Sequence, residues 1–152
     1  MCLPCTPGYA CPPGSTTPLP CPASTFSTST SLADLEQCDP CIPGHSCAIG
    51  TNQPFPCEPG TFAAAGAEKC SVCGAGTFQD ASGSGGCIRC PLGSFCPQGS
   101  TQPQPCAAGT AGTVVGLISQ EECTNCPVGT HTNSTGMSAC DPCVLLHHMS
   151  KL

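Results

Sequence analysis

Hydrophobic side chains are sparse along this chain and follow a cysteine-based pattern. Leu, Ile, Val and Phe make up 23 of the 152 residues, below the level at which a chain normally buries a stable core. The recurring pattern is a cysteine, two residues, a small residue, Thr and often an aromatic. Gly supplies a turn conformation that other residues resist, and a Thr-aromatic pair after it favours a short strand. The pattern predicts five small hairpins, which begin at Cys21, Cys57, Cys73, Cys106 and Cys126.

Phenylalanine and two apolar segments are the remaining hydrophobic features. We expect Phe26, Phe62 and Phe78 each to cover a neighbouring disulfide. The segments "GTVVGLIS" and "VLLHHMSKL" stand out on a polar chain, and exposed aliphatic patches indicate docking surfaces. They are complementary candidates for a head-to-tail contact between copies of the chain. The predicted assembly contacts are Val114, Val115, Leu117, Ile118, Val144, Leu145 and Leu146.

The cysteine content explains how such a chain can fold. It has 18 cysteines, a density typical of proteins that disulfides hold together because their hydrophobic surface is too small. Each bridge that closes a loop of this size contributes ~2–3 kcal/mol by restricting the unfolded chain. The sequence predicts a small disulfide-rich fold, an elongated tandem array of short β-hairpin modules with little helix and no central hydrophobic core. The expected location is extracellular, either secreted or on the cell surface.

The cysteines also define repeats. Six C-x2-C pairs are spaced 36, 32, 17, 36 and 17 residues apart, so long and short units alternate. Repeats with such short periods stack on their neighbours. The predicted units are long repeats at 2–37, 38–69 and 87–122, short repeats at 70–86 and 123–143, the second with an open terminal C-x2-C, and an apolar tail at 144–152.

Equivalent sequence at equivalent spacing argues for equivalent disulfides. The five predicted hairpins therefore close with the pairs Cys21–Cys38, Cys57–Cys70, Cys73–Cys87, Cys106–Cys123 and Cys126–Cys140. The cysteines between them pair in sequence as Cys5–Cys11, Cys41–Cys47 and Cys90–Cys96. A crossed arrangement, such as Cys90–Cys106 with Cys96–Cys123, satisfies the same spacing and stays open.

Both arrangements leave Cys2 and Cys143 without a partner inside the array. Cys2 resembles the closing cysteine of an upstream loop, and Cys143 the opening cysteine of a downstream loop. We therefore expect the array to continue, either through flanking repeats of a longer chain or through bonds from Cys143 of one copy to Cys2 of the next. A direct bond between Cys2 and Cys143 is the alternative.

Charge and hydropathy exclude several classes of partner. The formal net charge is -6, with three basic residues, whereas nucleic acids and anionic membrane surfaces require clustered Lys and Arg. We expect no membrane span, because no run of about 18 apolar residues occurs, and we recognise no signal peptide. The C-terminal Ser150-Lys151-Leu152 matches a peroxisomal address, which the cysteine content contradicts.

Zinc binding is the main chemical alternative. The cysteines at 70, 73, 87 and 90 read C-x2-C-x13-C-x2-C, and those at 123, 126, 140 and 143 repeat it, close to zinc-ribbon spacing. The other ten cysteines have no matching arrangement, so we expect neither a metal nor another cofactor. The histidines, His45, His131, His147 and His148, lie in no recognisable catalytic motif, and we expect no enzyme activity.

Two segments are candidates for glycosylation. Asn133-Ser134-Thr135 is an N-glycosylation sequon in a loop between two cysteines. The run "STFSTSTS" suits O-linked sugars, with an unmodified polar loop as the alternative. Its candidate sites are Ser24, Thr25, Ser27, Thr28, Ser29, Thr30 and Ser31.

These motifs bear a resemblance to a known family. The C-x2-C-P-x-G pattern, the C-x2-G-T-F loops and connectors such as "GSTTPLPCPAST" and "GSTQPQPCAAGT" resemble ephrin-receptor-like cysteine-rich repeats of large extracellular proteins. More distantly, the loops are similar to the first half of tumour-necrosis-factor-receptor modules. The resemblance runs from Cys2 to Cys143 and implies disulfide-linked β modules without catalysis. The sequence departs from the family pattern in "CGAG" at Cys73, and at Ala111 and His131, where the family tends to have an aromatic residue.

The sequence favours a structural function. We expect an extracellular building block of a fibre, surface coat or long adhesive ectodomain, whose partners are copies of itself, flanking repeats and glycans. The alternative is a receptor-type module with a ligand-binding face. Such faces rely on aromatic and Arg hot spots, and this chain has no Trp, one Tyr and a single arginine, Arg89.

Overall fold

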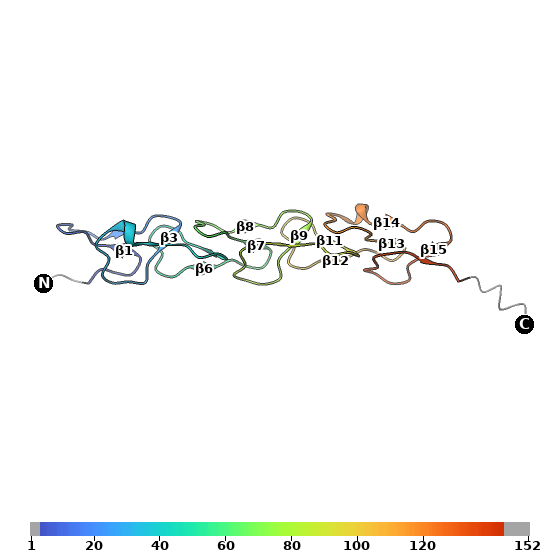
Figure 1. The fold of residues 1–152 in the computed structure, drawn as a ribbon, viewed down its shortest axis with the longest axis horizontal. Coiled ribbons are helices and arrows are strands. Elements are labelled where there is room, and N and C mark those ends of the chain that lie inside the picture. The colour runs from blue at the N-terminus through green and yellow to red at the C-terminus, as the bar shows by residue number, and fades with distance from the viewer. Residues whose placement is uncertain (1–3, 145–152) are drawn as a thin grey trace, which may run out of the picture. The chain divides into compact units, whose positions relative to one another are not determined.

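The computed structural model describes residues 4–144, which form eight antiparallel hairpins of two-residue strands (Figure 1). Each strand pairs only with the neighbouring strand in the sequence, so the hairpins follow one another along the chain. We number them hairpin 1 to hairpin 8. The prediction of a small disulfide-rich array of hairpin modules with little helix is confirmed.

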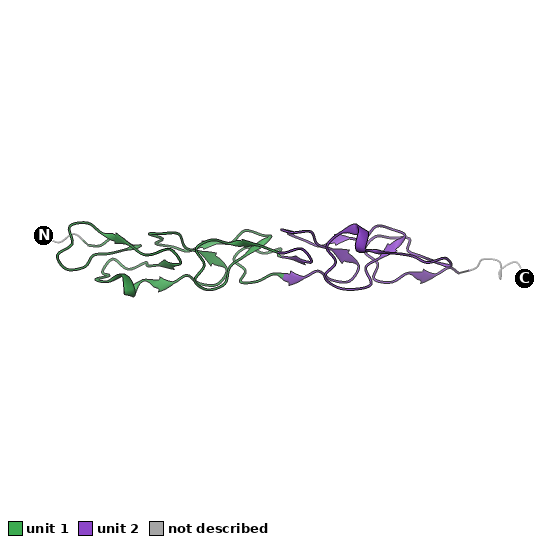
Figure 2. Ribbon diagram, turned by 90° about the horizontal axis from the view of Figure 1, so that it is seen from above, with its two compact units in different colours: residues 1–73, 79–87 green, residues 74–78, 88–152 purple. Residues whose placement is uncertain are grey.

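The chain divides into two compact units, shown in green and purple in Figure 2. Unit 1 contains residues 1–73 and 79–87. It holds hairpins 1 to 4, the loop of hairpin 5, and the short helix η1, Leu35–Gln37, which the Asp34 side chain caps. The strand pairs of hairpins 1 to 4 are β1 Tyr9–Ala10 with β2 Leu19–Pro20, β3 Thr25–Phe26 with β4 Asp39–Pro40, β5 His45–Ser46 with β6 Phe55–Pro56, and β7 Thr61–Phe62 with β8 Ser71–Val72.

Unit 2 contains residues 74–78 and 88–152. It holds the strands of hairpin 5, hairpins 6 to 8, and the short helix η2, Gln120–Glu122. The strand pairs are β9 Thr77–Phe78 with β10 Ile88–Arg89, β11 Ser94–Phe95 with β12 Gln104–Pro105, β13 Thr110–Ala111 with β14 Thr124–Asn125, and β15 Thr130–His131 with β16 Asp141–Pro142.

Each hairpin opens with the same β-turn, which begins one residue after a buried or half-buried cysteine. In hairpin 4, Thr61 N–H donates to Glu58 O over 3.0 Å, and Gly60 between them has φ +82°. A positive φ at the third turn residue is the type II geometry, which Gly adopts without strain and for which Pro, here Pro59, is favoured at the second position. The Thr61 hydroxyl donates to the same Glu58 carbonyl. The C-x-x-G-T signature therefore encodes one specific turn.

The number of hairpins exceeds the sequence prediction. All five predicted hairpins form, and three more occur where proline-rich connectors were expected, as hairpins 1, 3 and 6. Their first strands are Tyr9–Ala10, His45–Ser46 and Ser94–Phe95, which lack the Thr-aromatic pair on which the prediction depended. The structural repeat is thus a single hairpin of 16 to 20 residues between successive opening cysteines.

Most of the buried hydrophobic side chains are cysteines. Among the described residues, the buried hydrophobic side chains other than cysteine are Ala10, Ala63, Ala111 and Leu117. One buried cluster joins Leu117 to the Cys106–Cys123 bridge, with the Phe95 ring packed on it. Phe95 was not among the three phenylalanines predicted to cover a disulfide, and Phe26, Phe62 and Phe78 are half-buried, as Phe95 is.

Candidate functional site

The opening cysteine of every hairpin forms a disulfide within that hairpin, and its partner takes one of two positions. In hairpins 1, 3 and 6 the partner directly follows the first strand. In the other five hairpins it directly precedes the second strand. The bridges are Cys5–Cys11, Cys41–Cys47 and Cys90–Cys96 for the first kind, and Cys21–Cys38, Cys57–Cys70, Cys73–Cys87, Cys106–Cys123 and Cys126–Cys140 for the second.

The two partner positions lie opposite each other at the ends of the paired strands. The Cα–Cα distances are therefore the same for both kinds, 5.8 Å for Cys90–Cys96 and 6.0 Å for Cys106–Cys123, although 6 and 17 residues separate the cysteines. In this structure the pairs are the sequential ones, without crossing. Every cysteine of the two zinc-ribbon-like quartets except Cys143 is bonded to another cysteine, so these thiolates are not available to a metal.

Consecutive hairpins are joined by backbone hydrogen bonds that repeat with the hairpin. The N–H at the turn glycine position of one hairpin donates to the carbonyl after the first strand of the next hairpin. A glycine N–H in the loop of the next hairpin donates back to the carbonyl of the opening cysteine. The N–H of the residue after the first strand donates to the carbonyl that follows this loop glycine. Between hairpins 2 and 3 the bonds are Ser24 N–H to Cys47 O (2.8 Å), Gly50 N–H to Cys21 O (2.8 Å) and Ser27 N–H to Thr51 O (3.2 Å).

The same triple recurs in both units. In unit 1 it joins hairpin 3 to hairpin 4, and hairpin 4 to the loop of hairpin 5. In unit 2 it joins hairpin 6 to hairpin 7 and hairpin 7 to hairpin 8. The bonds between hairpins 6 and 7 are Gly93 N–H to Gly112 O (2.9 Å), Gly116 N–H to Cys90 O (2.8 Å) and Cys96 N–H to Leu117 O (2.8 Å).

Contacts also reach the second neighbour. A methyl group placed on Gly8 of hairpin 1 would lie 2.5 Å from the carbonyl oxygen of Gly50, the loop glycine of hairpin 3. Gly93 of hairpin 6 faces Gly136 of hairpin 8 in the same way, and a methyl group there would overlap the Gly136 carbonyl. Two features therefore require glycine at these turns. One is the positive φ, and the other is the close approach of the backbone of the second-neighbour hairpin.

Hairpin 2 is the exception, because Ser24 occupies the turn glycine position with φ +78°. The Ser24 N–H still donates to Cys47 O, as the turn glycine N–H does to the equivalent carbonyl in the other hairpins that form this triple. The backbone strain remains, since a side chain in the left-handed region costs about 1–2 kcal/mol. The sequence motif had placed Ser24 correctly in the turn without revealing this strain.

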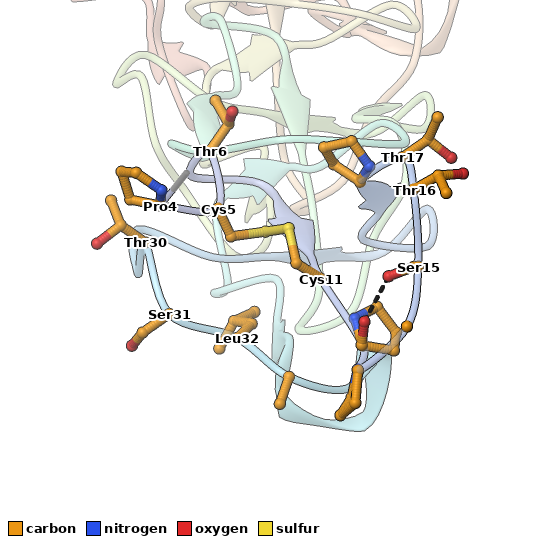
Figure 3. Close-up of a pocket in the computed structure, with 15 residues that line it drawn as sticks. Pro4, Cys5, Thr6, Cys11, Ser15, Thr16, Thr17, Thr30, Ser31 and Leu32 are labelled. Atoms are coloured by element: carbon orange, nitrogen blue, oxygen red, sulfur yellow. Dashed lines mark hydrogen bonds between the residues drawn. A yellow bond between two sulfur atoms is a disulfide. The ribbon is translucent and has the colours of Figure 1, made fainter. Parts of the chain in front are cut away.

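A cavity of about 910 Å³ lies at hairpin 1 (Figure 3). Its walls come from the Cys5–Cys11 bridge, the loop of hairpin 1 at Gly14 and Ser15, and the loop of hairpin 2 near Ser31. Thr and Ser residues contribute to its lining, as labelled in Figure 3, and the Ser15 hydroxyl donates to Pro12 O. Nothing in the sequence pattern indicated this cavity, because its walls belong to two loops of different length.

The predicted glycosylation residues differ in exposure. Asn133 is exposed in the loop of hairpin 8. In the Ser/Thr-rich run, Ser27 is 2% exposed and its hydroxyl accepts the Ser29 N–H, so Ser27 is removed from the candidate sites. The other candidates are half-buried or exposed, and the fully exposed ones are Thr28, Thr30 and Ser31.

The predicted assembly residues also divide. Val114, Val115 and Ile118 are exposed on the loop of hairpin 7, whereas Leu117 is 6% exposed and belongs to the cluster described above. Leu117 is therefore a packing residue and not a docking residue. Val144 is exposed, and the predicted contacts Leu145 and Leu146 lie outside the described residues.

Cys143 is an exposed free cysteine whose sulfur lies 3.7 Å from His131 Nδ1. Its proposed partner Cys2 lies outside the described residues. In the part of the chain that the structure describes, no three or more His, Cys, Asp or Glu side chains gather in a metal-binding arrangement, and no helix could cross a membrane.

Comparison with known proteins places these features in a family. The model of the family described as tyrosine-protein kinase ephrin type A/B receptor-like matches residues 60–110 and 112–151, more than half of the chain. No curated protein matches the sequence. The matched segments contain the C-x-x-G-T turns of hairpins 5, 7 and 8 and the within-hairpin disulfides of hairpins 5 to 8, and they are of a type found in extracellular receptor ectodomains. The chain therefore belongs to the ephrin-receptor-like family of cysteine-rich repeats.

Proposed function

We propose that this chain is a non-enzymatic structural segment of an extracellular protein, in which stacked hairpins form a disulfide-stabilised rod that resists extension. The observation that carries the proposal is the repetition of the backbone contacts. Each hairpin is closed by its own disulfide and bonded to the next through main-chain groups. A chain built so that every repeat does the same mechanical task fits a spacer or fibre component.

The physical basis is that the disulfides replace a core. A bridge that closes a loop of 17 residues, such as Cys106–Cys123, contributes about 3 kcal/mol through the unfolded state. The hydrogen bonds between hairpins add about 0.5–1.5 kcal/mol each. Because these contributions depend little on side-chain identity, the rod tolerates polar and glycosylated surfaces.

Single-molecule stretching tests this proposal. Each of the five longer loops can release roughly 40–55 Å of chain when its disulfide is reduced. We expect the oxidised chain to show little extension under a force at which the reduced chain extends fully. Equal extension of the oxidised and reduced chains would contradict the structural function. Because the experiment stretches one molecule at a time, its result does not depend on association between copies.

Glycosylation tests the extracellular part of the proposal. We expect a chain exported through a eukaryotic secretory pathway to carry an N-linked glycan at Asn133, because its side chain is exposed. Intact mass before and after glycosidase treatment measures this, with Asn133→Gln as the control that loses the glycan. An unglycosylated secreted chain would remove Asn133 from the proposal.

A receptor-type module is the alternative function, and one side chain favours it. Phe55 in β6 is 66% exposed, and exposed aromatic residues often anchor protein interfaces. A spacer should tolerate Phe55→Ser without any change in the stretching profile, in secretion or in the binding of the chain to cells. Loss of cell binding with an unchanged stretching profile would favour the receptor function.

A further inference from the structure

Hairpins 3, 4, 7 and 8 and the loop of hairpin 5 share one way of receiving the turn of the hairpin before them, whereas hairpin 2 has no loop glycine. As described for hairpin 3, the receiving groups are the carbonyl after the first strand, the N–H of the loop glycine and the next carbonyl, here Cys47 O, Gly50 N–H and Thr51 O. The second neighbour contributes close backbone contact, as between Gly8 and Gly50. Any hairpin with these groups available can receive a further turn of the same type.

Hairpin 1 has the same three groups at Cys11, Gly14 and Ser15. The equivalence is close, because Ser15 and Thr51 each close a turn onto the residue three positions earlier, with both the N–H and the hydroxyl. Within residues 4–144, Cys11 O, Gly14 N–H and Ser15 O have no hydrogen-bond partner. Gly14 and Ser15 are exposed.

The cavity of Figure 3 lies over these groups. Its other wall is the loop of hairpin 2, where Leu32 O accepts Cys11 N–H in the position that Thr51 O has in hairpin 3. The turn of an interior hairpin contacts the next hairpin and the hairpin after that. A turn bound in the cavity would likewise contact two successive hairpins, because hairpins 1 and 2 line it. The cavity has a volume of about 910 Å³ and is open to solvent on one side.

Hairpin 8 has the complementary groups. By comparison with hairpin 7, they are Gly129 N–H, Cys126 O and Thr132 N–H, and none has a hydrogen-bond partner in the described part of the chain. A methyl group on Gly129 would meet nothing within 4 Å, and the same holds for Gly109 of hairpin 7. Gly109 therefore lacks the second-neighbour contact that Gly93 makes.

We propose that the cavity at hairpin 1 of one copy binds the turn of hairpin 8 of a second copy. In this contact Gly129 N–H donates to Cys11 O, Gly14 N–H donates to Cys126 O, and Thr132 N–H donates to Ser15 O. Gly109 then packs on the Gly14 carbonyl as Gly8 packs on that of Gly50. The proposal extends the proposed structural function, since it makes the rod a subunit of a longer assembly.

The contact is head to tail, so each copy uses one cavity and one turn. Such heterologous contacts produce open filaments or closed rings. Because a few backbone hydrogen bonds and one small turn form the contact, the association is weak and depends on concentration. It requires no covalent bond between copies.

Sedimentation velocity of the oxidised chain over a wide concentration range tests the proposal. We expect the sedimentation coefficient to rise with concentration for the natural sequence. Gly109→Ala should weaken association at least tenfold, because its methyl group would collide with the Gly14 carbonyl of the next copy. Gly66→Ala is the control, since Gly66 has a similar positive φ, +74°, with nothing within 4 Å, and lies away from the contact.

Hydrogen exchange gives a second readout that does not depend on a variant. We expect the amides of Gly14 and Gly129 to exchange more slowly as concentration rises, while the Gly66 amide, which already bonds Cys41 O, keeps its rate. A chain that stays monomeric at all concentrations, or equal weakening by Gly109→Ala and Gly66→Ala, would overturn the proposal. The single-molecule stretching result would be unaffected by either outcome.

Discussion

Hairpins 6 and 7 share the position of the turn glycine and the pairing of two-residue strands but differ in what holds them. In hairpin 6 a disulfide of sequence separation 6 secures only the turn and first strand, and the turn glycine is packed against hairpin 8. In hairpin 7 a disulfide of separation 17 encloses the whole loop, and the turn glycine faces open space. The comparison teaches that covalent closure and packing on neighbours are separate sources of stability that different hairpins combine differently.

The turn glycines should show the largest difference. We expect Gly93→Ala to destabilise the chain by roughly 2–5 kcal/mol, because it combines left-handed strain with overlap on the Gly136 carbonyl. Gly109→Ala should cost only the strain, about 1–2 kcal/mol. Denaturant unfolding at low protein concentration, where copies do not associate, measures both. Equal losses would mean that hairpins 6 and 8 do not approach closely in solution.

The disulfides come next in size. Replacing both cysteines of the Cys106–Cys123 bridge by Ala should cost about 3 kcal/mol, and the same change at Cys90–Cys96 about 2 kcal/mol, because the longer loop gains more freedom when unfolded. Thermal unfolding of the two double variants compares them. A larger loss at Cys90–Cys96 would show that the short bridge mainly positions the turn in the folded state.

The residue after the turn glycine tests a smaller effect. The Thr110 hydroxyl of hairpin 7 donates to Ala107 O over 2.6 Å, whereas Ser94 at the same position of hairpin 6 makes no such bond. We therefore expect Thr110→Val to cost about 1 kcal/mol and Ser94→Ala close to nothing. Unfolding midpoints at a fixed denaturant slope give the two values, and an equal loss at Ser94 would contradict this interpretation.

Hairpin 2 extends the comparison to the smallest expected change. Ser24→Gly removes the strain at φ +78°, while the added glycine makes the unfolded chain more flexible. The balance should stabilise the chain by about 0.5–1 kcal/mol. Differential scanning calorimetry of the two chains measures it, and a loss of stability would indicate that the Ser24 side chain makes a favourable contact.

The local elements were predictable because their signals lie within a few residues. Cysteine, glycine and threonine at fixed spacing define the turn and the first strand, as at Cys57, Gly60 and Thr61. Hairpins 1, 3 and 6 were missed because their disulfides close after six residues, so that the rest of each hairpin looked like a connector. Their turns nevertheless carry the same glycine, which was the available signal.

The contacts between hairpins could not be predicted in the same way. The partners Ser24 and Cys47 lie 23 residues apart in sequence, and the equivalent partners Gly93 and Gly112 only 19. The main chain makes these bonds, so the glycines in the turn and loop mark where they form but do not identify their partners. The cavity at hairpin 1 depends on the same register and became visible only with the folded chain.

The second strands have a consequence for solubility. In the described chain each second strand pairs only with the first strand of its own hairpin, which leaves an open edge, a feature that invites aggregation through edge-to-edge pairing. In five hairpins the second strand ends in proline, for example Pro20 and Pro105. Because Cys21 N–H points inward to Gly8 O, alternation along the strand turns the Pro20 nitrogen outward, where it has no hydrogen to donate. In these five hairpins the proline removes a donor from the exposed edge, which disfavours edge-to-edge pairing.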